Sequence, residues 1–143
     1  MLQPADEQGI ELRPVRVDIS LDHKSFVARI RAELHQLVRA FAYRQWDEAA
    51  SLVRQRPGDE WTPERFEETL EPYFAEYGEL RFDHRSRMAT NTSVREVADH
   101  LWTVRQVIVD PQDDNMWFVE GEVDLRGDSA PAGVLVAVVR ISV

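Results

Sequence analysis

The chain has 143 residues, the size of one domain, which leaves no room for a second catalytic module. Hydrophobic residues make up 43% and charged residues 30%, so a folded core is expected rather than disorder. The formal net charge of −9 disfavours non-specific binding to a phosphate backbone. The lack of cysteine excludes disulfides, thiolate nucleophiles and cysteine zinc sites in this chain.

The first 21 residues mix prolines, a glycine and scattered charges without a sustained period. We expect an extended tail or linker over residues 1–21, in which residues 15–19 alternate as a short strand does. The start lacks the basic residues and apolar run of a signal peptide, and no stretch is apolar enough to span a bilayer. We therefore expect a cytoplasmic protein that does not contact a membrane.

Two helices are expected after this tail. Apolar residues three or four apart predict the first, beginning at Asp22 and packing on one side only: Phe26, Ile30, Leu34, Leu37, Val38 and Phe41. A shorter amphipathic segment follows, with Trp46, Ala49, Ala50 and Val53 directed inward. The Pro and Gly of residues 56–59 then break the pattern.

A third helix carries clear signals at both ends. Thr62 is a good N-cap, and Pro63 stands at the first helical position, where its missing N–H costs nothing. Trp61 and Phe66 are spaced for a hydrophobic staple, and Gly78 is suited to the C-terminal cap.

After the third helix, the spacing of apolar residues changes from the helical period of 3.6 to a period of 2, which predicts strands. A short strand is expected over residues 80–85, with His84 in phase with apolar neighbours, followed by a polar loop over residues 86–96. Three longer strands, joined by turn-rich links at 110–115 and 126–131, are expected in antiparallel hairpins: 101–109, 116–125 and 133–143. The chain is thus predicted to be a single α+β domain over residues 22–143, with N-terminal helices on one face of a bent antiparallel sheet.

Motifs that would identify an enzyme do not occur. There is no phosphate-binding loop, and the one lysine is Lys24. Neither a G-x-S-x-G elbow nor an H-E-x-x-H pair is found, so the sequence supports no ATPase or hydrolase activity, and no cofactor or metal is expected. Residues 110–115 lack the spacing of a calcium loop, which favours a hairpin turn there.

The aromatic residues allow two interpretations. Large rings fill the core of most domains, and this interpretation is favoured. The alternative is a ligand cavity between the helices and the sheet, with His84 or Glu120 as a base. The candidate cavity residues are Tyr43, Trp46, Tyr73, Tyr77, His84, Trp102, Gln106, Trp117 and Glu120.

The charge is unevenly distributed along the chain. Residues 1–56 hold 9 basic and 8 acidic residues, whereas residues 57–143 hold 8 basic and 18 acidic ones. The acidic half suits a basic partner, and Glu120, Glu122 and Asp124 on one strand are a candidate docking stripe. The arginines of the first helix could form a patch for nucleic acid, which we consider the least favoured hypothesis: Arg29, Arg31 and Arg39.

Four segments carry a family resemblance: 26–34, 70–79, 102–111 and 115–125. They include Trp-x-Val-Arg-Gln-Val, then Asp-Pro, and then a second Trp. In these the chain resembles the uncharacterised C-terminal domain of bacterial superfamily 2 DEAD/DEAH-box helicases. The order of helices and strands is also similar to the nuclear transport factor 2-like (polyketide cyclase-like) cone fold, a likeness that does not give function.

The resemblance implies an accessory domain rather than a motor, because the helicase core and its nucleotide-binding motifs do not occur in these residues. The first hypothesis is therefore a non-catalytic accessory or protein-interaction domain that docks on a helicase core or associates with itself through the outer sheet face. The alternative is a small-molecule-binding or cyclase/isomerase-like domain with the aromatic-lined cavity. Direct binding to nucleic acid ranks last.

Overall fold

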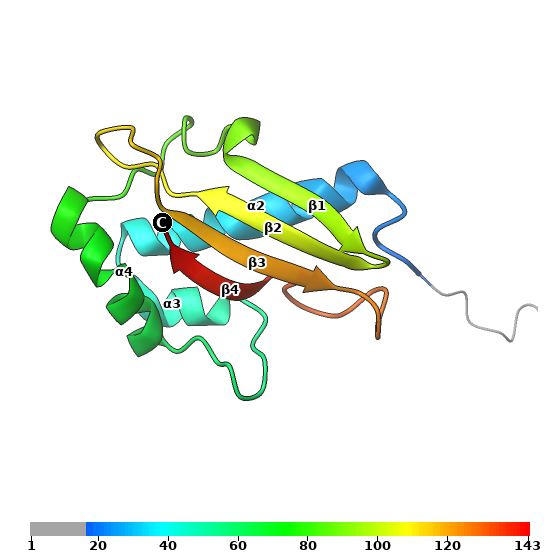
Figure 1. Ribbon diagram of the computed structural model, residues 1–143. Coiled ribbons are helices and arrows are strands. Elements are labelled where there is room, and N and C mark those ends of the chain that lie inside the picture. The colour runs from blue at the N-terminus through cyan, green and yellow to red at the C-terminus, as the bar shows by residue number, and fades with distance from the viewer. Residues whose placement is uncertain (1–16) are drawn as a thin grey trace, which may run out of the picture.

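The computed structural model describes residues 17–143, and its helices precede its strands. The elements are α2 (His23–Ala42), α3 (Trp46–Ser51), α4 (Pro63–Tyr77), a short 3-10 helix η1 (Ala89–Asn91), β1 (Thr92–Ala98), β2 (Leu101–Val107), β3 (Phe118–Asp124) and β4 (Ala137–Ser142). The strands form one antiparallel sheet in the order β1-β2-β3-β4 (Figure 1). This arrangement confirms the α+β prediction.

Helix α2 covers one face of the sheet, while α3 and α4 lie together at one end of it (Figure 1). The Asp22 side chain caps α2 by accepting from the Ser25 N–H, so the helix begins as predicted. The first half of α2 packs on sheet residues that include Trp102 and Val104. Its second half joins a separate core cluster with α3 and α4, which includes Phe41 and Phe66.

Both predicted ends of α4 are confirmed. The Thr62 hydroxyl accepts from the Arg65 N–H at 3.1 Å, and the rings of Trp61 and Phe66 lie 5.0 Å apart as the staple requires. Gly78 ends the helix with φ of 79°, a conformation that favours glycine. These local signals fix where α4 lies, and α4 forms one wall of the candidate site.

The strand predicted over residues 80–85 is wrong. Arg81 donates its N–H to the Val109 carbonyl, but no strand ladder continues from this bond in residues 80–85. The Asp83 N–H donates to the Ser86 hydroxyl, and the Ser86 N–H donates to the Asp83 carboxylate. These side-chain bonds compete with a strand ladder and fold the segment into a turn, which leaves His84 exposed.

The loop predicted over residues 86–96 is also wrong in its second half, which belongs to β1. Residues Thr92–Ala98 pair with β2 from Thr92↔Gln106 to Ala98↔Leu101. Most side chains of β1 are exposed, because it is the edge strand of the sheet, and Val94 is the β1 residue that packs on the core cluster beneath α2. The strand therefore forms because it pairs with β2. Its own sequence is mostly polar and shows little of the alternation of apolar and polar residues by which a strand is predicted.

Strand β4 begins four residues later than the predicted start at Gly133. The reason is Glu33 on α2, whose carboxylate accepts the N–H groups of Leu135 and Val136 at 2.9 to 3.1 Å. These two residues are buried, but their N–H groups bond to the helix instead of to a strand. Burial raises the pKa of Glu33, while the two N–H donors act in the opposite direction.

The predicted strand over residues 15–19 lies partly outside the described residues, and residues 19 and 20 form a turn. The Ile19 N–H donates to the Ser129 carbonyl at 3.0 Å. The segment that precedes α2 is therefore attached to the loop between β3 and β4.

Candidate functional site

The predicted cavity residues lie in several different surroundings. Tyr73, Tyr77 and Trp117 pack ring against ring, with Tyr73 at 5.1 Å from Tyr77 and 5.8 Å from Trp117. The Tyr73 ring is fully buried, and its hydroxyl donates to the Glu79 carbonyl. Burial raises the pKa of Tyr73, so this phenol stays neutral.

Trp102 and Gln106 belong to other parts of the interior. Trp102 packs edge-on against Phe26, 4.7 Å away, in the cluster beneath the first half of α2. The buried Gln106 amide accepts from the Thr92 hydroxyl and donates to the Ser86 and Val107 carbonyls. Its hydrogen bonds thus hold the segment before β1 against β2.

The remaining candidates lie at the surface. Tyr43 is 61% exposed, and the exposed His84 belongs to the turn described above. Glu120 accepts from the Arg140 guanidinium at 2.6 Å on the sheet face opposite α2. Of the nine predicted residues, Trp46 lines a surface groove beside α4.

The predicted acidic stripe on β3 is matched by arginines. Glu120 pairs with Arg140 and Glu122 with Arg56, each at 2.6 Å, and Asp124 pairs with Arg126 at 2.8 Å. The hydrogen bonds from Arg126 lower the pKa of Asp124 to about 2. The outer sheet face therefore carries neutralised charge pairs rather than a free acidic surface.

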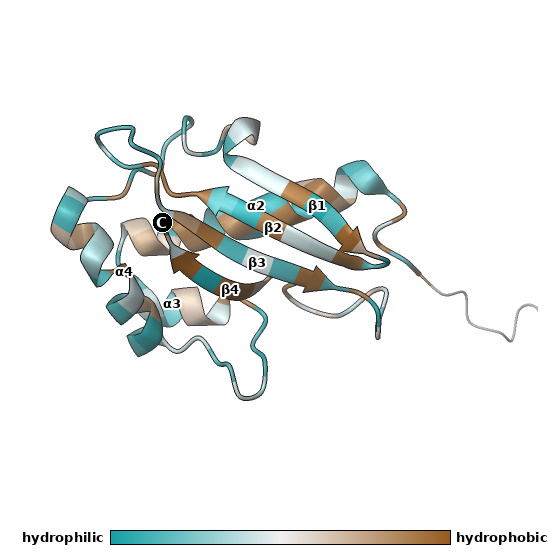
Figure 2. Cartoon of the chain, in the orientation of Figure 1, coloured by the Kyte–Doolittle hydropathy of each residue, from teal (hydrophilic) through white to brown (hydrophobic). Residues whose placement is uncertain are grey.

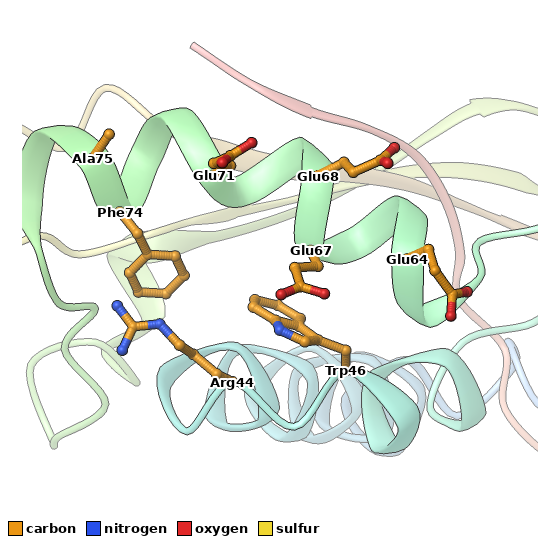
Figure 3. Close-up of a pocket in the computed structure, with 8 residues that line it drawn as sticks. All are labelled: Arg44, Trp46, Glu64, Glu67, Glu68, Glu71, Phe74 and Ala75. Atoms are coloured by element: carbon orange, nitrogen blue, oxygen red, sulfur yellow. The ribbon is translucent and has the colours of Figure 1, made fainter.

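Acidic side chains without arginine partners in the described residues are concentrated beside α3 and α4 instead. Between residues 59 and 79 the chain holds eight acidic residues and one arginine. A groove of about 540 Å³ runs between the two helices, and we call it the α3–α4 groove (Figure 3). Its lining residues are Arg44, Trp46, Glu64, Glu67, Glu68, Glu71, Phe74 and Ala75.

Four glutamates of this groove follow one another on α4, at positions 64, 67, 68 and 71. Spacings of three and four place them along one side of the helix. None of the four forms an ion pair within residues 17–143, in contrast to the acids of β3. All four side chains are exposed, and Figure 2 colours much of α4 as hydrophilic. The spacing was visible in the sequence and could have revealed the groove wall.

Two aromatic rings form the apolar part of the groove. Trp46 and Phe74 are half-buried and meet at 6.3 Å between ring centroids. The Arg44 guanidinium lies over the Phe74 ring at 4.1 Å and donates to the Gly78 carbonyl at 3.0 Å. Figure 3 shows Arg44 directed at Phe74 and the Glu67 carboxylate above the Trp46 indole. The groove thus combines carboxylates with aromatic surface.

The arginines proposed for nucleic acid have partners within the chain. Arg29 donates to the Gly133 carbonyl at 2.6 Å, and Arg31 donates to the Arg87 carbonyl at 3.0 Å. Arg39 lies over the Tyr43 ring at 5.6 Å. These contacts attach α2 to its neighbours.

One further cluster contains residue types that bind metals. The ligand atoms of Glu96, Asp99 and His100 lie within 4.8 Å of one another. Both His100 ring nitrogens are already engaged, Nε2 with Asp18 at 2.7 Å and Nδ1 with Asp99 at 2.9 Å. The arrangement therefore acts as a hydrogen-bond cluster that attaches the segment before α2.

Comparison with known protein families gives one match. A family model described as Domain of unknown function (DUF3516) covers residues 3–141, nearly the full chain. The chain belongs to this family. No curated protein and no solved structure matches the DUF3516 chain. Among residues 17–143, no helix has the length and apolar character to cross a bilayer.

Proposed function

We propose that this DUF3516 domain is a non-catalytic protein-interaction domain that binds a basic segment of a partner protein in the α3–α4 groove. The observation that carries the proposal is the contrast between two acidic surfaces. The β3 carboxylates are paired with arginines at 2.6 to 2.8 Å, whereas the α4 glutamates have no ion pair in the described residues.

The placement of these glutamates supports the proposal energetically. Glu64 and Glu68, like Glu67 and Glu71, are like charges four residues apart, which destabilises an isolated helix by about 0.2–0.5 kcal/mol per pair. A basic partner would relieve this repulsion. It would also approach faster, because complementary charge steers association.

The resemblance to helicase C-terminal domains makes a helicase core the first partner to test, within a cytoplasmic protein. In this proposal residues 22–143 act as one domain, and the fold is of the nuclear transport factor 2-like kind. A small-molecule site has less support, since Tyr73 and Trp102 pack in separate core clusters.

The test uses a fluorescein-labelled peptide that alternates Arg and Gly, with binding followed by fluorescence anisotropy. We expect the double variant Glu67→Gln/Glu71→Gln to bind about two- to thirtyfold more weakly, since each surface charge contributes roughly 0.2–1 kcal/mol. Binding should also weaken as salt is added.

A matched control separates the groove from the overall charge. Glu76 and Glu79 are exposed, lie near the end of α4 and do not line the groove, so Glu76→Gln/Glu79→Gln removes the same charge elsewhere. We expect this control to bind nearly as well as the unmodified protein. Equal weakening in the two double variants would show attraction to net charge alone and would overturn the proposal.

A further inference from the structure

Arginine side chains in this molecule repeatedly cover aromatic rings. Within the described residues, guanidinium groups lie over five rings, including Arg44 over Phe74 at 4.1 Å and Arg65 over Trp61 at 3.8 Å. Such stacking is favourable because the ring face carries partial negative charge. Each of these rings thus already has a guanidinium of this chain beside it, and Phe118 has two.

Trp46 differs from these rings. Its indole is half-buried against Phe41 and Phe74, and no described arginine or lysine lies over it. Indole is the side chain that attracts cations most strongly. The groove that it lines is walled by carboxylates that form no ion pair within residues 17–143, and Glu67 points toward the indole (Figure 3).

We infer that the α3–α4 groove selects arginine over lysine, with the guanidinium of a partner arginine stacked on Trp46 and bonded to the Glu67 carboxylate. This inference rests on the proposed function and adds the chemistry of the side chain that is recognised. Arg44 on Phe74 is the same contact made within the chain, directly beside the Trp46 ring.

The geometry favours arginine for two reasons. A guanidinium is planar and can stack on a ring while its N–H groups still reach a carboxylate. A lysine ammonium is a compact, strongly hydrated charge and cannot stack in this way. Carboxylates alone also favour a guanidinium, because its N–H groups form paired hydrogen bonds with them, so the part of the preference that is lost without the indole reports the ring.

The test compares two labelled peptides of equal length and charge, one alternating Arg and Gly and the other alternating Lys and Gly. We expect the Arg peptide to bind about threefold or more tightly, as an exposed cation–ring contact implies. Trp46→Leu should reduce the affinity for the Arg peptide more than the affinity for the Lys peptide, and so narrow the difference between them. Trp46→Phe, which keeps a ring, should retain part of the preference.

Tyr43→Leu is the matched control, because Tyr43 is an exposed ring outside the groove. It should leave the preference unchanged. Should Trp46→Leu fail to fold, the indole N–H resonance of Trp46 in the unmodified protein provides a second measurement. It should shift more with the Arg peptide than with the Lys peptide at equal occupancy.

The outcomes distinguish this inference from the proposed function. Equal binding of both peptides, still lost in Glu67→Gln/Glu71→Gln, would overturn the arginine preference and leave the basic-segment groove intact. Binding insensitive to that double variant would overturn both. A preference for arginine that is undiminished in a folded Trp46→Leu variant would also overturn the inference, because the indole would then contribute nothing to it.

Discussion

At the scale of single residues, His100 connects the segment before α2 to the sheet. It lies in the turn between β1 and β2 with φ of 60°, and its two ring nitrogens face Asp18 and Asp99. Its N–H donates to Glu96, while Arg126 and Asp128 line the same surface depression. A single titratable side chain therefore holds two segments that are distant in sequence.

The pH dependence of this contact follows from its two pKa shifts. The hydrogen bonds from Ser20 and then His100 lower the pKa of Asp18 from 3.8 to about 2. The hydrogen bonds to Asp18 and Asp99 raise the pKa of His100 above its ordinary value of 6.5. Between pH 3.8 and pH 6.5, Asp18 is therefore ionised and His100 is protonated. The contact between them weakens as the pH rises through the folded-state pKa of His100, because the imidazole then loses its charge.

We predict that raising the pH through that value shifts the amide resonance of Ile19, whose N–H donates to Ser129. His100→Asn should abolish this pH-dependent shift, and asparagine tolerates the positive φ at the position. His84→Asn, at an exposed histidine elsewhere, serves as the control. An Ile19 shift that persists in His100→Asn would refute the assignment to His100.

At the scale of elements, the pairing of β3 with β4 depends on a residue without a side chain. A Cβ added at Gly121 would lie 2.8 Å from the Ala137 carbonyl and 2.9 Å from the Val136 side chain. Both distances are shorter than ordinary contact, and the carbonyl belongs to the paired strand. Glycine is required here by the close approach of the neighbouring backbone.

Gly121→Ala should therefore destabilise the fold by about 1–3 kcal/mol, the typical cost of overpacking a core. Gly127→Ala is the matched control, because a Cβ there meets nothing within 4 Å. It should change the free energy of unfolding by less than about 0.5 kcal/mol. Urea unfolding measures both, and equal stability of the two variants would contradict this role for Gly121.

Elements with strong local signals could be predicted from the sequence. The caps at Asp22, Thr62 and Gly78 and the apolar side of α2 act within a few residues, so α2 and α4 were found. The links predicted at residues 110–115 and 126–131 do lie between β2 and β3 and between β3 and β4, because their turn residues also act locally. For example, the buried carboxylate of Asp110 accepts three backbone N–H groups inside its own turn.

Features that depend on distant partners could not be predicted. Strand β1 exists because β2 pairs with it, and β4 begins late because Glu33, about 100 positions away in the chain, takes two of the N–H groups before it. The aromatic residues could not be assigned to one cavity for the same reason. Composition does not show that Tyr73 and Trp102 pack in separate clusters.

At the scale of the whole molecule, the acidic residues behind the net charge of −9 are not equally available to a partner. Arginines neutralise the β3 acids on the sheet, while the α4 glutamates beside Trp46 and Phe74 form no ion pair in the part of the chain that the structure describes. The sequence predicted an acidic half and placed its candidate docking stripe on the strand that holds Glu120, Glu122 and Asp124. The folded arrangement decides which acids form ion pairs, and in the described residues it leaves the α4 glutamates, rather than the β3 acids, without arginine partners.

The central claim is that a basic segment binds in the α3–α4 groove, and mapping the amide resonances of the full chain tests it most directly. During titration with the Arg–Gly peptide, we predict saturable shifts gathered on α3 and α4, with residues around Trp46, Glu67 and Phe74 affected most. The amides of β2 and β3 should change little. Shifts gathered on the sheet, or spread evenly over the surface without saturation, would contradict the account.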